Sequence, residues 1–241
     1  MEQKVLRAVM VCLLLMSMAI LGRETAAYVE TVNAVNALQG NNADTDGIPT
    51  VVIDAGHGGG DPGKIGINGA PEKDINLRIT EKLRQYLEAD GIRVVLTRET
   101  EDGLYDASAP NKKVQDMKRR IEKIEQTDPV LTVSIHQNSY HEEAIRGGQV
   151  FYYKTSVRGK KLAQILQERF DYVLGDANKR QAKANDNYYL LLHVKEPIII
   201  AECGFLSNWE EAEKLETKEY QDRLAWTLHM GIMEYLNQEI G

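Results

Sequence analysis

Short apolar runs alternate with amphipathic segments along most of this sequence. An apolar run at 50–53 leads into a glycine-rich loop at 56–69, and a segment with one apolar helical face follows. The positions on that face are Ile75, Ile79, Leu83 and Leu87. We expect Asp74 to cap the start of this helix and Gly91 to end it. A second apolar run at 92–96 completes a strand, a helix and a strand, which is the order of a parallel βαβ unit.

The same alternation continues toward the C-terminus. Further helices are expected at 114–124, at 162–173, from about 209 and at about 220–236. Further apolar runs lie at 130–135, 150–153, 188–192 and 197–201. This order predicts an α/β fold, namely a single domain whose twisted, mostly parallel sheet has helices on both faces. Ligand sites in such folds lie at the carboxyl ends of the strands.

The first 48 residues follow a different pattern. Residues 1–27 combine a positive start, an uncharged apolar run and a small-residue stretch, which is the layout of a secretory signal. The apolar run is short for a membrane span, although an uncleaved N-terminal anchor remains open. Residues 28–48 lack apolar periodicity and predict a flexible linker. We therefore expect a folded domain at 49–241 that is exported across the membrane.

Charge and cysteine content narrow the class of protein. Residues 1–27 carry three basic and two acidic side chains, so the rest of the chain has a net charge of −8 against −7 for the whole. An acidic chain of this kind argues against nucleic acid as a partner. Beyond residue 27 the only cysteine is Cys203, so the exported part cannot form an internal disulfide.

Residues able to bind a metal stand at the ends of the predicted strands. His57 follows the first strand, His136 follows the apolar run at 130–135, and Glu72 directly precedes the first long helix. Since the carboxyl ends of parallel strands share one edge of a sheet, we expect these side chains to converge. Two imidazoles and one carboxylate suit Zn²⁺ and leave its fourth position open, as in a catalytic site.

A zinc hydrolase also needs a group that moves protons. Zinc activates water and polarises a carbonyl, and Glu202 ends an apolar strand where burial would raise its pKa into the useful range. Asp54 is placed to orient a metal-bound imidazole. Asn138 and Arg98 are candidates for orienting the site or holding a substrate carboxylate, and Arg98 is equally suited to a structural ion pair.

Simpler interpretations exist for each of these signals. A single histidine at a strand end is more often structural, and Glu72 before a helix could merely favour the helix dipole. The segment 58–64 has the glycine and lysine spacing of a phosphate-binding loop, but Ile65 replaces the Ser or Thr that meets magnesium, which argues against a nucleotide. Cys203 beside Glu202 could be a thiol nucleophile, and is more simply a small buried strand residue.

Five short segments, taken together, identify a family. They read DAGHGGGD at 54–61, EKDINL at 72–77, TR at 97–98, SIHQN at 134–138 and ECGFLSN at 202–208. In this order they resemble the zinc-dependent N-acetylmuramoyl-L-alanine amidases of the type-3 amidase family, and the resemblance extends over 51–236. It implies one Zn²⁺ ion held by His57, Glu72 and His136, with Glu202 as catalytic acid and base. The implied reaction is hydrolysis of the amide between N-acetylmuramic acid and the L-alanine of peptidoglycan.

The short exported form narrows this expectation further. Together with the aromatic segment 151–153, it is most similar to the germination-specific amidases of endospore formers. That similarity implies removal of stem peptides from cortex muramic acid, for muramic-δ-lactam formation. Three alternatives stay open: a vegetative cell-wall amidase, a zinc peptidase acting on stem peptides, and a non-catalytic peptidoglycan-binding module. A lone domain with an exposed metal edge could also depend on an activating partner protein.

Overall fold

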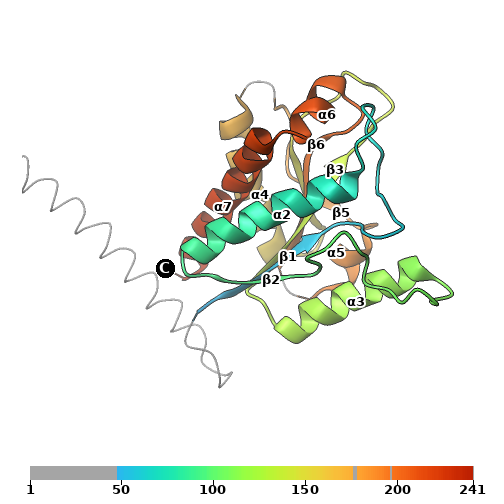
Figure 1. Cartoon of the computed structure of the whole chain (residues 1–241). Helices are drawn as coiled ribbons and strands as arrows, with labels where there is room; N and C mark the ends of the chain where they lie inside the picture. The colour runs from blue at the N-terminus through green and yellow to red at the C-terminus, as the bar shows by residue number, and fades with distance from the viewer. Residues whose placement is uncertain (1–47, 176–177, 196, 241) are drawn as a thin grey trace, which may run out of the picture. The chain divides into compact units, whose positions relative to one another are not determined.

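The structure is a computed structural model and describes residues 48–175, 178–195 and 197–240 (Figure 1). The chain divides into two compact units, Pro49–Leu236 and a second made of Met1–Ile48 with Asn237–Gly241. The expected signal or anchor and nearly all of the expected linker lie outside the described residues, and the architecture below is that of the first unit. Within the described ranges, no helix combines the length and apolar character needed to cross a membrane.

A mixed, mostly parallel sheet of six strands forms the centre of this unit, as the alternation predicts. The strands are β1 (Thr50–Ala55), β2 (Arg93–Leu96), β3 (Leu131–Asn138), β4 (Gln149–Tyr153), β5 (Lys183–Asn185) and β6 (Ile198–Phe205), in the order β2-β1-β3-β6-β4-β5. β1 pairs in parallel with β2 and β3, and β3 pairs in parallel with β6. β4 is parallel to β5 and antiparallel to β6. The sequence pattern missed β5, because its three residues contain no apolar run.

The expected helices are present, the apolar run at 188–192 adds a short helix that was not expected, and one expected helix cap is corrected. The helices are α2 (Glu72–Ala89), α3 (Lys112–Thr127), α4 (Val157–Leu174), α5 (Tyr189–His193), α6 (Trp209–Leu215) and α7 (Lys218–Ile240). The expectation that Asp74 caps α2 was wrong, since Pro71 is the N-cap residue and the helix begins at Glu72. Asp74 instead lies in the first turn, where an acidic side chain favours the positive end of the helix dipole.

The pairing register of the strands determines which of their residues share one face of the sheet. Successive strand residues point to opposite faces, and the register aligns Asp54 with Ser134, Ser134 with Ile200, and His136 with Glu202. The face that carries them is covered by α3 and α5, which contact each other, whereas α2 packs on β1, β2 and β3 (Figure 1). A buried apolar cluster that includes Val52 joins α3 and α5 to this face. The polar strand ends therefore meet at the carboxyl edge above an apolar core.

Candidate active site

His57 lies two residues after β1 in a left-handed backbone conformation. Its φ angle is 63°, a left-handed value that non-glycine residues seldom adopt. The preceding residue, Gly56, passes so close to His136 that an added Cβ would lie 2.3 Å from the imidazole ring. A side chain at Gly56 is therefore excluded, and the imidazoles of His57 and His136 lie edge to face with centroids 5.0 Å apart.

The carboxylate of Glu72 lies between the two imidazoles. Its Oε1 atom is 3.3 Å from Nε2 of His57 and 3.0 Å from Nδ1 of His136. One potential ligand atom from each of the three residues lies within 4.8 Å of the others. Glu72 is only 3% exposed, and although burial opposes its ionisation, the two imidazoles hold the pKa of its carboxyl well below the ordinary value. An ionised carboxylate with two imidazoles is a donor set that fits zinc.

Asp61 orients the imidazole of His57. Its Oδ2 atom lies 3.1 Å from Nδ1 of His57, which leaves Nε2 facing Glu72. Burial tends to lower the pKa of His57, but Glu72 and Asp61 outweigh it and the pKa is raised. A carboxylate on the outer nitrogen of a metal-binding histidine is a common supporting arrangement. Asp54 was expected in this role; the sequence signal for Asp61 is its place four residues after His57 in the same motif.

Glu202 presents a weakly acidic carboxyl group beside the imidazoles. It is 6% exposed, and burial raises the pKa of its carboxyl to about 7. Its Oε1 atom accepts a hydrogen bond of 3.4 Å from the hydroxyl of Tyr188. Its Oε2 atom is buried and has no hydrogen-bond partner among the described residues. A carboxyl group with a pKa near neutrality is suited to accept a proton and to give it back.

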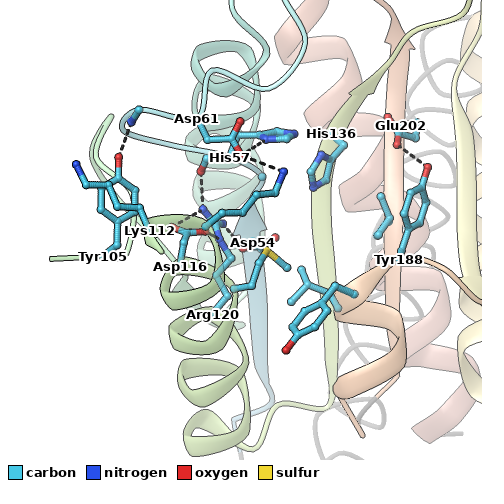
Figure 2. A pocket seen from close by; sticks show the side chains of 17 residues that line it. Asp54, His57, Asp61, Tyr105, Lys112, Asp116, Arg120, His136, Tyr188 and Glu202 are labelled. Carbon is cyan, nitrogen blue, oxygen red and sulfur yellow. Dashed lines mark hydrogen bonds and ion pairs between the residues drawn. The ribbon is translucent and has the colours of Figure 1, made fainter. Parts of the chain in front are cut away.

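A cavity of about 480 Å³ opens beside these groups (Figure 2). One wall comes from the loop after β1 and from α3, and the other from β6 and from Tyr188 with the start of α5. Met117, Leu190 and Ile200 supply apolar lining, while Lys112 of α3 also borders the cavity. The volume lies in the range of pockets that bind small ligands or short peptides.

A buried arginine, Arg120 of α3, fixes the backbone that carries His57. Its guanidinium donates to Oδ1 of Asp54 at 2.6 Å, to Oδ2 of Asp116 at 2.6 Å and to the carbonyl of His57 at 2.5 Å. Arg120 is 1% exposed, and Figure 2 shows it reaching from α3 toward the loop below His57. Sequence reasoning missed this residue. The available signal was that Arg120 shares the apolar face of its helix with Met117 and Ile124.

Arg98 acts on the same stretch of backbone. It donates to the carbonyls of Ala55 and Gly56 at 2.9 and 3.0 Å, and to the carbonyl of Lys73 at 2.7 Å. Its remaining hydrogen bond goes to the carbonyl of Thr100, and the side chain is buried. Among the described residues, Arg98 thus binds backbone carbonyls, and it does not line the cavity.

Asp54 hydrogen-bonds neither imidazole, in contrast to the expectation from the sequence. It accepts hydrogen bonds from Thr97 at 2.7 Å, from Ser134 at 2.5 Å and from Arg120. Burial alone would raise the pKa of Asp54, but the Arg120 guanidinium and the two hydroxyls lower it to about 2. The reason is register: Asp54 pairs with Ser134, two residues before His136 on β3. Asp54 is linked to His57 by Arg120, which donates hydrogen bonds both to Oδ1 of Asp54 and to the carbonyl of His57.

Asn138 and Cys203, the two other candidates from the sequence, do not line the cavity. Asn138 accepts a hydrogen bond from the backbone N–H of Ser139 at 2.8 Å. Cys203 follows Glu202 on β6 and so points to the opposite face of the sheet. Its thiol is fully buried, and burial together with the Glu202 carboxylate raises its pKa. Cys203 is thus a core residue, not an activated nucleophile.

Comparison with known proteins adds an independent line of evidence. The family model described as N-acetylmuramoyl-L-alanine amidase matches residues 51–234. The germination-specific N-acetylmuramoyl-L-alanine amidase of Bacillus subtilis is 32% identical over 192 residues, covering 78% of this chain and 80% of the relative. The CwlD amidase of Clostridioides difficile, solved in complex with the GerS lipoprotein, is 39% identical with a TM-score of 0.76, covering 78% of this chain and 98% of that one. The catalytic domain of CwlV from Paenibacillus polymyxa is 30% identical with a TM-score of 0.69, covering 78% and 98%.

Proposed function

This chain belongs to the type-3 family of N-acetylmuramoyl-L-alanine amidases, and on that premise we propose that zinc held by His57, Glu72 and His136 supports its hydrolysis of peptidoglycan. The enzyme is an N-acetylmuramoyl-L-alanine amidase, so the bond cut is the amide that joins N-acetylmuramic acid to the stem peptide. The observation that carries the proposal is the convergence of three ligand atoms within 4.8 Å at the edge of a cavity that Glu202 also lines.

Different residues of the chain transfer the proton, orient a metal ligand and support the loop that carries it. Zinc, when bound, supplies Lewis acidity toward the amide carbonyl and the attacking water. Glu202 takes a proton from that water as the new C–O bond forms, and returns it to the amide nitrogen as the C–N bond breaks. Asp61 holds the imidazole of His57 in the orientation that faces Glu72. Arg120 and Arg98 hold the carbonyls of the loop on which His57 stands.

Chelation is expected to abolish amide cleavage, and added Zn²⁺ is expected to restore it. The reason is that the proposed mechanism assigns polarisation of the amide carbonyl to the metal. Activity is measured on purified peptidoglycan by mass spectrometry of the released products, and metal content is measured on the same protein sample. Free stem peptides that begin with L-alanine would support the proposal.

Other products would contradict specific parts of it. Fragments cut within the stem peptide would point to a zinc peptidase instead. A protein that binds peptidoglycan but contains no zinc and cuts no amide would be a binding module.

We further propose that the substrate is spore-cortex peptidoglycan. The supporting observation is the similarity to the germination-specific amidase of Bacillus subtilis. The same digestion, carried out in parallel on cortex and vegetative peptidoglycan, tests this setting. Equal or faster cleavage of the vegetative wall would favour a general cell-wall role.

Export and assistance by a partner protein complete the proposal. Residues 1–27 would direct the chain across the membrane as a signal or an uncleaved anchor, followed by a linker at 28–48. N-terminal sequencing of the exported protein distinguishes the two forms.

The similar Clostridioides difficile enzyme was solved with a lipoprotein bound, which supports an activating partner for this chain. Full zinc occupancy and full turnover by the purified domain alone would contradict that dependence.

A further inference from the structure

The hydroxyl group of Tyr188 gives Glu202 a hydrogen-bond partner that the proposed metal ligands do not supply. The hydroxyl lies 3.4 Å from Oε1 of Glu202, and both side chains line the same cavity. Figure 2 shows Tyr188 pointing toward Glu202, with His136 on the other side of the carboxyl group. The two oxygens of Glu202 are therefore not equivalent, because Oε2 is buried without a partner among the described residues.

Tyr188 is held in place by contacts that do not involve its hydroxyl. Its backbone N–H donates to Oδ1 of Asn185 at 2.8 Å, which fixes the turn that leads into α5. Its ring packs edge to face on Phe151 of β4, with centroids 5.4 Å apart. The ring is thus fixed by the fold, and the hydroxyl is free to act on the group in front of it.

We propose that Tyr188 is a positioning residue, whose hydroxyl group holds the carboxyl group of Glu202 in the orientation in which it exchanges a proton with water. Since Oε2 has no partner among the described residues, the hydroxyl of Tyr188 is the side-chain donor that fixes how the carboxyl group is turned. The inference rests on the proposed role of Glu202 as the acid and base, and deepens it.

The proton balance is simple. One O–H bond of water breaks while its oxygen bonds to the amide carbon, and the proton forms an O–H bond with the carboxylate of Glu202. The same proton then moves to the nitrogen of L-alanine as the C–N bond breaks, which returns Glu202 to its starting state. Tyr188 keeps its own proton throughout, since burial and the Glu202 carboxylate both raise the pKa of its hydroxyl.

Tyr188→Phe tests the inference, because it keeps the ring and its packing on Phe151 but removes the hydroxyl. We expect kcat to fall about tenfold, as for the loss of one hydrogen bond to a charged group, with unchanged KM and zinc content. Tyr172→Phe, the same change at an exposed position on α4, serves as the control and should leave all three quantities unchanged. In a Glu202→Gln background, Tyr188→Phe should change the residual rate by less than about twofold, because the two residues act through one group.

Several outcomes would overturn the inference. Unchanged kcat would show that the hydroxyl does not matter. A rise in KM with unchanged kcat would assign Tyr188 to substrate binding, and loss of zinc or of thermal stability in proportion to activity would assign it a structural role. If the wild-type protein itself lacks zinc-dependent cleavage, the proposed function fails. If the wild-type protein shows zinc-dependent cleavage and Tyr188→Phe cleaves equally well, the proposed function stands and this inference fails.

Discussion

Replacing Glu202 by glutamine is expected to lower kcat by about 10²- to 10⁴-fold while zinc remains bound. The amide of glutamine has nearly the shape of the carboxyl group but cannot accept the proton of water. Glu202 lies on β6 beside His136 and is not one of the three residues whose ligand atoms converge. Metal binding and proton transfer are therefore assigned to different side chains, and one substitution separates them.

The measurement combines steady-state kinetics with the zinc content of the same protein sample. Glu168→Gln is a matched control, because Glu168 is exposed on α4 and does not line the cavity. This control should keep both activity and metal. A Glu202→Gln variant with wild-type turnover, or one that has lost its zinc, would contradict the division of roles proposed above.

Replacing Arg120 by methionine is expected to lower the free energy of unfolding by about 3–5 kcal/mol, the range found when one partner of a buried ion pair is removed. Asp54 and Asp116 would each lose a hydrogen bond of 2.6 Å from the guanidinium, and Asp54 would remain fully buried. The carbonyl of His57 would lose its bond as well, so we expect weaker zinc binding in the folded variant. Denaturant unfolding and zinc titration measure the two effects separately.

The neighbouring residue provides the control for this substitution. Arg119 pairs with Asp106 at 2.7 Å, but on the exposed side of α3, so Arg119→Met should leave stability close to that of the wild type. If the two variants lost equal stability, the effect would belong to the helix and not to the buried pair.

The pH dependence of the Arg120 variant has a definite sign. In the wild type the pKa of Asp54 is held at about 2, against an ordinary value of 3.8, so its contribution is complete above about pH 4 and is lost as the pH falls toward 2. Without Arg120, burial would raise the pKa of Asp54, and protonation would relieve the buried charge. The stability deficit of the variant should therefore shrink as the pH is lowered from 7 to 4. A deficit that is independent of pH would exclude Asp54 as its source.

The fold class and the residues that converge could be predicted from the sequence. Strand-like and helical periodicities separate clearly between residues 50 and 236, because a parallel sheet covered by helices needs apolar strands and one-sided helices. The four residues that converge lie near one edge of the sheet, because His57 follows β1, Glu72 begins α2, and His136 and Glu202 lie in the C-terminal halves of β3 and β6. This general property of the fold made the four residues predictable.

The groups that support these four residues became clear from the packing of distant segments. Whether Asp54 or Asp61 meets an imidazole depends on strand register and on the loop conformation after β1, which periodicity does not encode. Arg120 shares the apolar face of its helix, but its partner Asp54 is known only from the packing of α3 against the sheet. Tyr188 reaches Glu202 because the turn before α5 places it there, 14 residues away along the chain. Contacts of this kind arise from packing between distant segments, so a local sequence pattern cannot specify them.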